Sequence, residues 1–210
     1  MSIGTEFPSG KRPRRTHIFA KEANLCYVEP HWCSKRLFAV EQFPGTIYDP
    51  FCGTGRVVDA ARAAGYATRA TDIVNRGYEH FDGVLDVFNI DRLDRDVSIV
   101  GNPPFEDEIL QHIINLNPLK AALIWPTARV TAAWWLSTTS LAREWQMTPR
   151  PAMPPLSYIL AGNKPEGARV EHCWLVFERG YCGPRELEWL HRDRDLPRRT
   201  ASRASYELLR

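Results

Sequence analysis

The chain has 210 residues, 44% of them hydrophobic, which suits one buried core and is too little for two comfortable domains. Its formal net charge of +2 is too small to indicate a nucleic-acid partner, and no apolar run reaches the length of a membrane span. The five cysteines include no C-x-x-C pair, so we predict no metal site. An odd number of cysteines without a signal peptide favours reduced thiols and a cytoplasmic protein.

Charge is concentrated near the two ends of the sequence. Residues 1–24 are polar and basic, contain two prolines, and are predicted to form a flexible tail. Residues 191–210 form a second charged tail that is rich in arginine. Such tails fit contacts to phosphate groups, and they fit solvated, disordered ends equally well. Residues 25–190 are then a single folded domain.

The first part of this domain alternates between helix and strand. Apolar spacing predicts a helix over residues 34–41 and a strand over residues 46–48. The strand ends at Asp49 and leads into a Gly53-x-Gly55 turn. An alanine-rich pattern then predicts a helix over residues 57–64, which Gly65 ends. Glycine has no Cβ atom, so such a loop can turn sharply and let a ligand approach its backbone.

Two further strands also end in polar side chains. A strand over residues 67–70 precedes Asp72, and a strand over residues 97–100 precedes Asn102. Asp72 follows the glycine loop at the separation where a Rossmann-like unit places an acid on ribose hydroxyl groups. Open α/β sheets bind ligands at the carboxyl ends of their strands. Asp49, Asp72 and Asn102 are therefore candidate ligand contacts.

The second half of the domain is less regular. Residues 106–116 predict a helix, and the nearly continuous apolar run over residues 119–125 predicts a strand covered on both faces. The alternation of strands and helices indicates a parallel, doubly wound sheet. We expect residues 127–144 to become helical in their second half, residues 149–155 to form a proline-rich loop and residues 172–177 to form the last strand. Residues 186–189 are expected to form at most one short element.

Two motifs together resemble the S-adenosylmethionine-dependent amino-methyltransferases. The motifs are Asp49-Pro50-Phe51-Cys52-Gly53-Thr54-Gly55 and, later in the chain, Asn102-Pro103-Pro104-Phe105. That family includes DNA adenine-N6, RNA guanine-N2 and adenine-N6, and protein glutamine-N5 enzymes. The resemblance covers residues 27–189. It implies an α/β, Rossmann-like class I methyltransferase fold with a mostly parallel seven-stranded sheet and an antiparallel last strand.

The resemblance also implies the cofactor, S-adenosyl-L-methionine, and the residues that contact it. They lie before the first strand, in the glycine loop, at the end of the second strand and in the apolar-acid-apolar segment that follows. They are Tyr27, Glu29, Pro30, Trp32, Asp49, Pro50, Phe51, Cys52, Gly53, Gly55, Asp72, Ile73, Asp86, Val87 and Asn102. Without the family, Tyr27 and Trp32 are ordinary core aromatics. The family segment places Asp86 on the adenine amino group, and Asp82 is a competing candidate for that contact. The alternative for Asp86 is a surface acid in a loop.

The second motif suits an amine acceptor. A conjugated amine is a poor nucleophile until acceptors hold its N–H bonds. Asn102 offers a side-chain carbonyl oxygen and Pro103 a backbone carbonyl. Pro104 stiffens the turn, and Phe105 offers a face on which a base can stack, worth roughly 1–3 kcal/mol. The alternative for this tetrapeptide is a rigid turn that merely closes a strand.

The resemblance to small prophage-type DNA adenine-N6 methyltransferases favours adenine N6 in DNA as the acceptor. A base in a duplex must be flipped out to reach Asn102. Residues 127–170 are then the substrate-recognition segments, and their cations Arg129, Arg150, Lys164 and Arg169 the substrate contacts. The alternatives are an RNA amino-methyltransferase, a protein glutamine-N5 enzyme and a catalytically silent binding module of the same fold. We expect a nucleic-acid partner, and a monomer or a homodimer.

Overall fold

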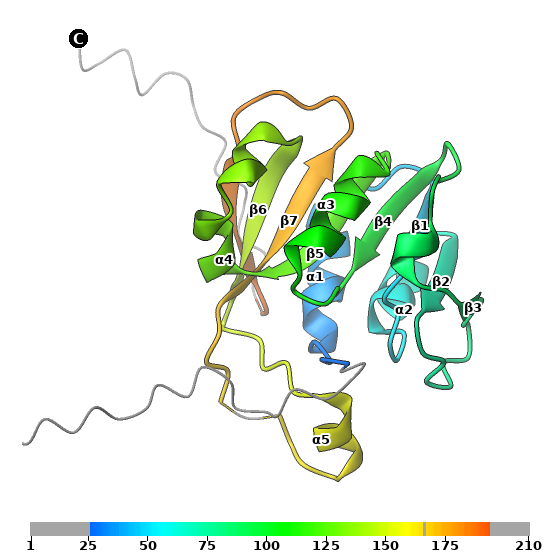
Figure 1. Ribbon diagram of the computed structural model, residues 1–210. Helices are drawn as coiled ribbons and strands as arrows, with labels where there is room; N and C mark the ends of the chain where they lie inside the picture. The colour runs from blue at the N-terminus through cyan, green and yellow to red at the C-terminus, as the bar shows by residue number, and fades with distance from the viewer. Residues whose placement is uncertain (1–25, 166, 194–210) are drawn as a thin grey trace, which may run out of the picture.

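The computed structural model describes residues 26–165 and 167–193, so residues 1–24 and most of the charged segment 191–210 lie outside the described residues. The described part forms one eight-stranded sheet in the order β3-β2-β1-β4-β5-β7-β6-β8 (Figure 1). Its strands are β1 (Thr46–Asp49), β2 (Thr68–Asp72), β3 (Gly83–Val84), β4 (Val97–Gly101), β5 (Lys120–Pro126), β6 (Leu141–Thr148), β7 (His172–Glu178) and β8 (Glu186–His191). The helices are α1 (His31–Val40), α2 (Arg56–Ala63), α3 (Asp107–Asn115), α4 (Thr127–Ala132) and α5 (Leu156–Leu160), with 3₁₀ turns η1 (Val87–Asn89) and η2 (Trp134–Thr138).

The strand directions confirm a mostly parallel α/β sheet. Strands β1 to β5 are parallel to one another, and β7 is antiparallel to both of its neighbours, β5 and β6. Strand β8 runs parallel to β6. Hence β7, which covers the predicted residues 172–177, is the one strand of the described sheet that runs against the others. The predicted number of seven strands was wrong, because residues 186–191 add an eighth strand at the edge.

Helices cover both faces of the sheet, so the central strands are apolar on both sides. On β5, Ala121, Leu123 and Trp125 pack into the core cluster that contains α3 and α4, whereas Ala122 and Ile124 pack into the cluster that contains α1 and α2. In Figure 1, α3 lies in front of the sheet and α1 behind it. This arrangement explains the continuous apolar run of β5, as expected for a strand between two helical layers.

The prediction for residues 127–144 was wrong in its second half. The helix α4 occupies the first half, a 3₁₀ turn follows, and β6 begins at Leu141. Strand β6 is rich in Leu, Ala, Arg, Glu, Gln and Met, which favour a helix in isolation. Here β6 lies between β7 and β8, and hydrogen bonding to both strands overrides that local preference.

A buried carboxylate joins the two halves of the fold. Glu41, directly after α1, accepts hydrogen bonds from Lys120 Nζ at 2.5 Å, Arg143 Nε at 2.6 Å and Trp145 Nε1 at 2.7 Å. Its exposed fraction is 2%. Burial opposes ionisation, but the hydrogen bonds from Arg143, Lys120 and Trp145 outweigh it and lower the pKa of Glu41. The carboxylate thus links α1 to β5 and β6.

No helix within the described ranges is long and apolar enough to cross a membrane.

Candidate functional site

Three polar residues meet at the carboxyl ends of adjacent strands. Asp49 ends β1, Asp72 ends β2, and Asn102 follows β4, and these three strands are neighbours in the sheet. A Cβ atom placed on Gly101 would lie only 2.8 Å from Asp49 Oδ1. A larger residue at this position would therefore displace the carboxylate. The structure brings together the two sequence motifs that the chain separates by about fifty residues.

The glycine loop is held by the end of β2. The Gly53 N–H donates to Asp72 Oδ2 at 2.9 Å, and the Cys52 N–H donates to the Thr71 carbonyl at 3.0 Å. Gly53 and Gly55 have φ angles of 53° and 85°, in the left-handed region that favours glycine. The loop conformation therefore depends on both its glycines and on Asp72.

Part of the space left by these glycines is filled by the protein itself. A Cβ atom on Gly55 would lie 2.0 Å from the ring of Tyr78, and one on Gly53 would lie 3.0 Å from Cys26 Sγ. The Tyr78 hydroxyl donates to Asp59 of α2 at 2.7 Å, which fixes the ring. At Gly55, the close approach expected for a ligand is therefore made by Tyr78, a residue that the motif analysis missed.

Asp72 has more partners within the chain than the sequence indicated. Besides Gly53, its carboxylate accepts hydrogen bonds from the Val74 N–H at 3.0 Å and from Arg76 at 2.6 Å. Arg76 follows Asp72 by four residues, and this spacing is the sequence feature that could have indicated the ion pair between them. Asp72 thus organises the loop through hydrogen bonds to Gly53, Val74 and Arg76.

Negative charge accumulates in the buried centre of the site. Asp49 is 1% exposed and Glu29 is 5% exposed. Burial raises the pKa of Asp49 well above its ordinary value, and the nearby charges of Glu29 and Asp72 raise it further. Burial also raises the pKa of Glu29. A cationic ligand at this position would relieve the repulsion and favour ionised carboxylates.

Asn102 is fixed in one orientation. Its Nδ2 donates to the Tyr27 carbonyl and to Glu29 Oε2, both at 3.0 Å. A backbone carbonyl only accepts hydrogen bonds, so the amide nitrogen must face Tyr27. The other atom of the amide, Oδ1, is buried and has no hydrogen-bond partner among residues 26–165 and 167–193. The site therefore presents a buried acceptor to which none of these residues donates.

Phe105 is held by a set of aromatic and cationic side chains. Its ring centroid lies 5.7 Å from that of Trp125 and 5.5 Å from that of His172. Arg129 donates to the Phe105 carbonyl, forms an ion pair with Asp107 at 3.2 Å and stacks over the Trp125 ring at 5.4 Å. Burial lowers the pKa of His172 to about 4, so its imidazole is neutral at physiological pH.

The segment before α1 contacts both the motif and the proline-rich loop. Val28 N–H donates to the Pro154 carbonyl at 2.9 Å, and Leu156 N–H donates to the Cys26 carbonyl at 2.8 Å. Arg56 of α2 donates to the Glu29 carbonyl at 2.5 Å. Pro30 caps α1, and Trp32 packs partly against the core cluster of α1 and α2. These contacts place Tyr27 and Glu29 next to Asn102, whereas Trp32 is partly buried against the cluster of α1 and α2.

The remaining predicted cofactor contacts differ in exposure. Ile73 is 50% exposed. Asp86 accepts a hydrogen bond from the Phe88 N–H and so caps η1, whereas Val87 is buried in the core. Phe88, beside it, is 47% exposed. The competing candidate Asp82 accepts a hydrogen bond from the Ala70 N–H at 2.6 Å.

Pro50 and Cys52 are buried and Phe51 is half-buried. Burial raises the pKa of the Cys52 thiol well above its ordinary value, so it is not a reactive thiolate.

The four predicted substrate cations are spread over α4, the proline-rich loop and the segment that follows α5. Arg150 forms an ion pair with Glu171, and both side chains are about half exposed. Lys164 and Arg169 are exposed on the segment that follows α5. Helix α5 stands away from the sheet in Figure 1. Among these four cations, Arg129 contacts the Asn-Pro-Pro-Phe motif, through its hydrogen bond to the Phe105 carbonyl.

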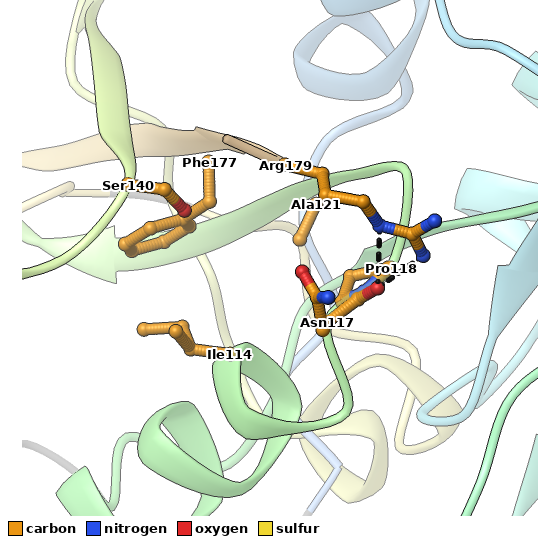
Figure 2. A pocket seen from close by; sticks show the side chains of 7 residues that line it. All are labelled: Ile114, Asn117, Pro118, Ala121, Ser140, Phe177 and Arg179. Atoms are coloured by element: carbon orange, nitrogen blue, oxygen red, sulfur yellow. Dashed lines mark hydrogen bonds between the residues drawn. The ribbon is translucent and has the colours of Figure 1, made fainter. Parts of the chain in front are cut away.

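Two other features are separate from this site. A small hollow lies beside the start of β5 and the end of α3, and Figure 2 shows Arg179 bonded to the Asn117 carbonyl there. It adjoins the amino end of β5, whereas the candidate site lies at the carboxyl ends of the strands. Within the described ranges, no group of three or more His, Cys, Asp or Glu residues is arranged to hold a metal ion.

The fold is that of Rossmann-like methyltransferases. A proposed RNA methyltransferase from Pyrococcus horikoshii superposes with a TM-score of 0.50 at 14% identity, over 68% of this chain and 79% of that chain. The M protein of the type I restriction enzyme EcoKI gives 0.49 at 15% identity, over 73% and 44%. A TehB-like S-adenosylmethionine-dependent methyltransferase from Corynebacterium glutamicum gives 0.45 at 18% identity, over 70% and 87%. No protein-family model and no curated protein matches the sequence.

Proposed function

We propose that this protein is an S-adenosyl-L-methionine-dependent methyltransferase that acts on an exocyclic amino nitrogen, with N6 of adenine in DNA as the favoured acceptor. The observation that carries the proposal is the buried Oδ1 of Asn102, for which the described part of the chain supplies no hydrogen-bond donor. An acceptor atom without a donor is costly in a buried site, unless a ligand supplies the donor. An amino group has the N–H bonds that such an atom needs.

The cofactor fits the residues around the glycine loop. S-adenosyl-L-methionine carries a positively charged sulfonium and an ammonium group, and the buried carboxylates of Asp49 and Glu29 supply the opposite charge. In this proposal Asp72 also accepts a hydrogen bond from a ribose hydroxyl group. Ile73 and Phe88 offer exposed apolar surface of the kind that packs against an adenine ring. The bound cofactor would supply an activated methyl group.

The residues of the second motif would hold the acceptor. In this proposal Asn102 Oδ1 accepts a hydrogen bond from one N–H of the amine, and the Pro103 carbonyl accepts a hydrogen bond from the other. Phe105 provides a stacking surface, and His172 and Trp125 hold its ring in place. Holding the amine in line with the methyl group supplies most of the rate in such a reaction. The nitrogen loses its proton readily once it is methylated, so no separate general base is required.

Recognition of the acceptor is assigned to residues 127–170. The proline-rich loop reaches the motif through Tyr27, and the exposed cations Lys164 and Arg169 follow α5. Cations on such a segment suit the phosphates of a nucleic acid. The described chain has little material beyond the core, so long sequence readout in a major groove is not expected.

The first test is transfer of a tritiated methyl group from S-adenosyl-L-methionine to four acceptors in parallel: duplex DNA, single-stranded DNA, total RNA and a protein extract. Nucleoside digestion and mass spectrometry then identify the product. N6-methyladenine in DNA is the expected result. Label in RNA or protein would support methyl transfer by this protein and would refute DNA as its acceptor. Cofactor binding without label would favour the silent binding module.

Two variants separate the roles of the two motifs. Asn102→Ala is expected to abolish transfer while leaving cofactor binding largely intact. Asp72→Ala is expected to weaken cofactor binding, because it removes the partner of the Gly53 N–H as well as a ligand contact. Calorimetry with S-adenosylmethionine measures both. An unchanged dissociation constant in Asp72→Ala would remove this residue from the site.

A further inference from the structure

The outer edge of the sheet is open at β8. Among the described residues, β8 pairs only with β6 and stands last in the strand order. The opposite edge strand, β3, has two residues, whereas β8 has six. A long open edge presents a row of unpaired N–H and C=O groups to another strand, and proteins usually keep such edges short or cover them.

The structure shows which backbone groups of β8 face outward. The Arg192 N–H, directly after β8, donates to the Thr148 carbonyl of β6 at 2.9 Å. Backbone groups alternate between the two sides of a strand, so Leu190 and Glu188 also face β6. Leu187, Trp189 and His191 therefore direct their N–H and C=O groups away from the sheet.

The same edge carries large apolar side chains that are exposed. Leu187 is 60% exposed and Trp189 is 61% exposed, whereas Leu190, on the other face of the strand, is 1% exposed. Exposed leucine and tryptophan on an open edge strand mark a surface that associates with a partner.

We infer that β8 pairs antiparallel with β8 of a second copy of this chain, about a twofold axis at Trp189. This inference concerns assembly and is independent of the proposed function. A twofold axis makes the interface self-complementary, so each residue meets its counterpart symmetrically. In this register the outward-facing Leu187 lies opposite His191 of the second copy, and the two Trp189 residues lie opposite each other. Glu186 then lies opposite Arg192.

Charge distinguishes this register from its neighbours. An axis at Glu188 would place two like charges opposite each other, and an axis at Leu187 would place Glu186 opposite Glu188. Like charges directly opposite are destabilising in a sheet. An axis at Leu190 would shorten the paired segment. Glu186 is 58% exposed and Arg192 is 49% exposed, so both side chains are accessible to a second copy. Exposed ion pairs add little affinity, so this pair selects the register while backbone bonds and apolar contact hold the dimer.

Sedimentation equilibrium of the full chain tests the dimer. The expected mass is twice the 24.0 kDa of one chain. Trp189→Glu is expected to yield a monomer. The matched control is Trp134→Glu, at a tryptophan that is 78% exposed on another element, and it is expected to stay dimeric. A monomeric wild type, as would follow if residues after 193 cover β8, would overturn the inference. A dimer that survives Trp189→Glu would overturn it as well.

Charge exchange and cross-linking test the register. Glu186→Arg and Arg192→Glu are each expected to weaken the dimer, and the double variant is expected to restore it. Directly opposite residues of a hydrogen-bonded antiparallel pair have Cα atoms about 5.5 Å apart, within the range of a disulfide. In a Cys182→Ser background, Trp189→Cys is therefore expected to cross-link two copies, and Leu187→Cys alone is not. The reverse pattern, or no rescue by charge exchange, would refute this register.

Discussion

The hydrogen bond from Asn102 to Glu29 predicts that one of these two positions must carry an amide and the other an acceptor. Asn102→Asp keeps an acceptor oxygen at the same position but removes the donor that now serves Tyr27 and Glu29. Two carboxylates about 3 Å apart repel each other, so the pair keeps one shared proton until the pH exceeds a raised upper pKa, and above that pKa neither group can donate. Adding Glu29→Gln to this variant supplies an amide N–H that can donate to the carboxylate at position 102. It also restores the net charge of the wild type. We expect Asn102→Asp to be slow and the double variant to recover.

The magnitude follows from the two lost hydrogen bonds. A hydrogen bond to a charged group contributes about 1.5–3 kcal/mol, and each 1.4 kcal/mol is a factor of about ten in rate. With about 1 kcal/mol added for the bond to the Tyr27 carbonyl, the loss is about 2.5–4 kcal/mol, so Asn102→Asp should lower methyl transfer roughly 60- to 700-fold at alkaline pH. The double variant still lacks the bond to the Tyr27 carbonyl, worth about 1 kcal/mol, and should remain roughly fivefold below wild type.

The assay is single-turnover methyl transfer across a pH series, with the dissociation constant of S-adenosylmethionine measured alongside. Glu29 already has a raised pKa through burial, and a second carboxylate raises the upper pKa of the pair further. One shared proton restores a donor, so Asn102→Asp should gain activity as pH falls through that pKa. Wild type and the double variant should lack this gain. Full activity of Asn102→Asp at alkaline pH, or a double variant as slow as the single one, would refute the reasoning.

Three further predictions concern the loop, the core and the motif. Gly55→Ala is expected to disrupt the loop, because its Cβ would lie 2.0 Å from the Tyr78 ring. Gly65→Ala has a similar φ but open space, so it should lower the free energy of unfolding in urea by only about 1–2 kcal/mol. Equal losses would refute the clash. Glu41→Gln should cost about 1–3 kcal/mol, because Lys120 and Arg143 lose their buried carboxylate partner and keep the partly exposed Glu178. The pKa of Glu41 is lowered on folding, so its contribution to the free energy of unfolding is present above the unfolded pKa and is lost as pH falls through the folded pKa. Thermal unfolding of the variant should lack this pH dependence. Arg129→Ala removes the donor to the Phe105 carbonyl, and Arg129→Lys replaces its planar guanidinium with an ammonium group that lacks the same geometry. Both variants should lower methyl transfer about tenfold and leave the affinity for the cofactor unchanged. Weakened cofactor binding would contradict this positioning role.

The part of the site that sequence could predict is the part encoded locally. Each of β1 and β4 is a short apolar run that ends in a polar residue, and the position of that residue follows from the parallel sheet. Asp49 and Asn102 could therefore be placed at one edge before any coordinates were known. The glycine loop could be placed for the same reason, because its strand and its helix flank it directly.

What sequence missed depends on contacts between distant residues. Nothing near Tyr78 indicates that its ring fills the space at Gly55, and nothing near Phe105 indicates that Arg129 bonds its carbonyl. Strand β6 has the local composition of a helix, and its place in the sheet is decided by β7, more than twenty residues later in the chain. For residues 186–189 the sequence indicates one short element of unspecified type, because exposed and buried residues there form no continuous apolar run, and the structure shows the strand β8 (Glu186–His191).

The short bridge between Tyr27 and Pro155 has a consequence for changing the specificity of this protein. The Tyr27 carbonyl orients Asn102, and the residues on either side of Tyr27 are bonded to Pro154 and Leu156. The loop assigned to recognition and the amide assigned to catalysis therefore share one piece of backbone. Grafting a foreign loop between residues 149 and 170 would disturb Asn102 unless residues 154–156 were retained. A segment that keeps those three residues and varies only beyond α5 is the one that can be exchanged without disturbing the acceptor atom.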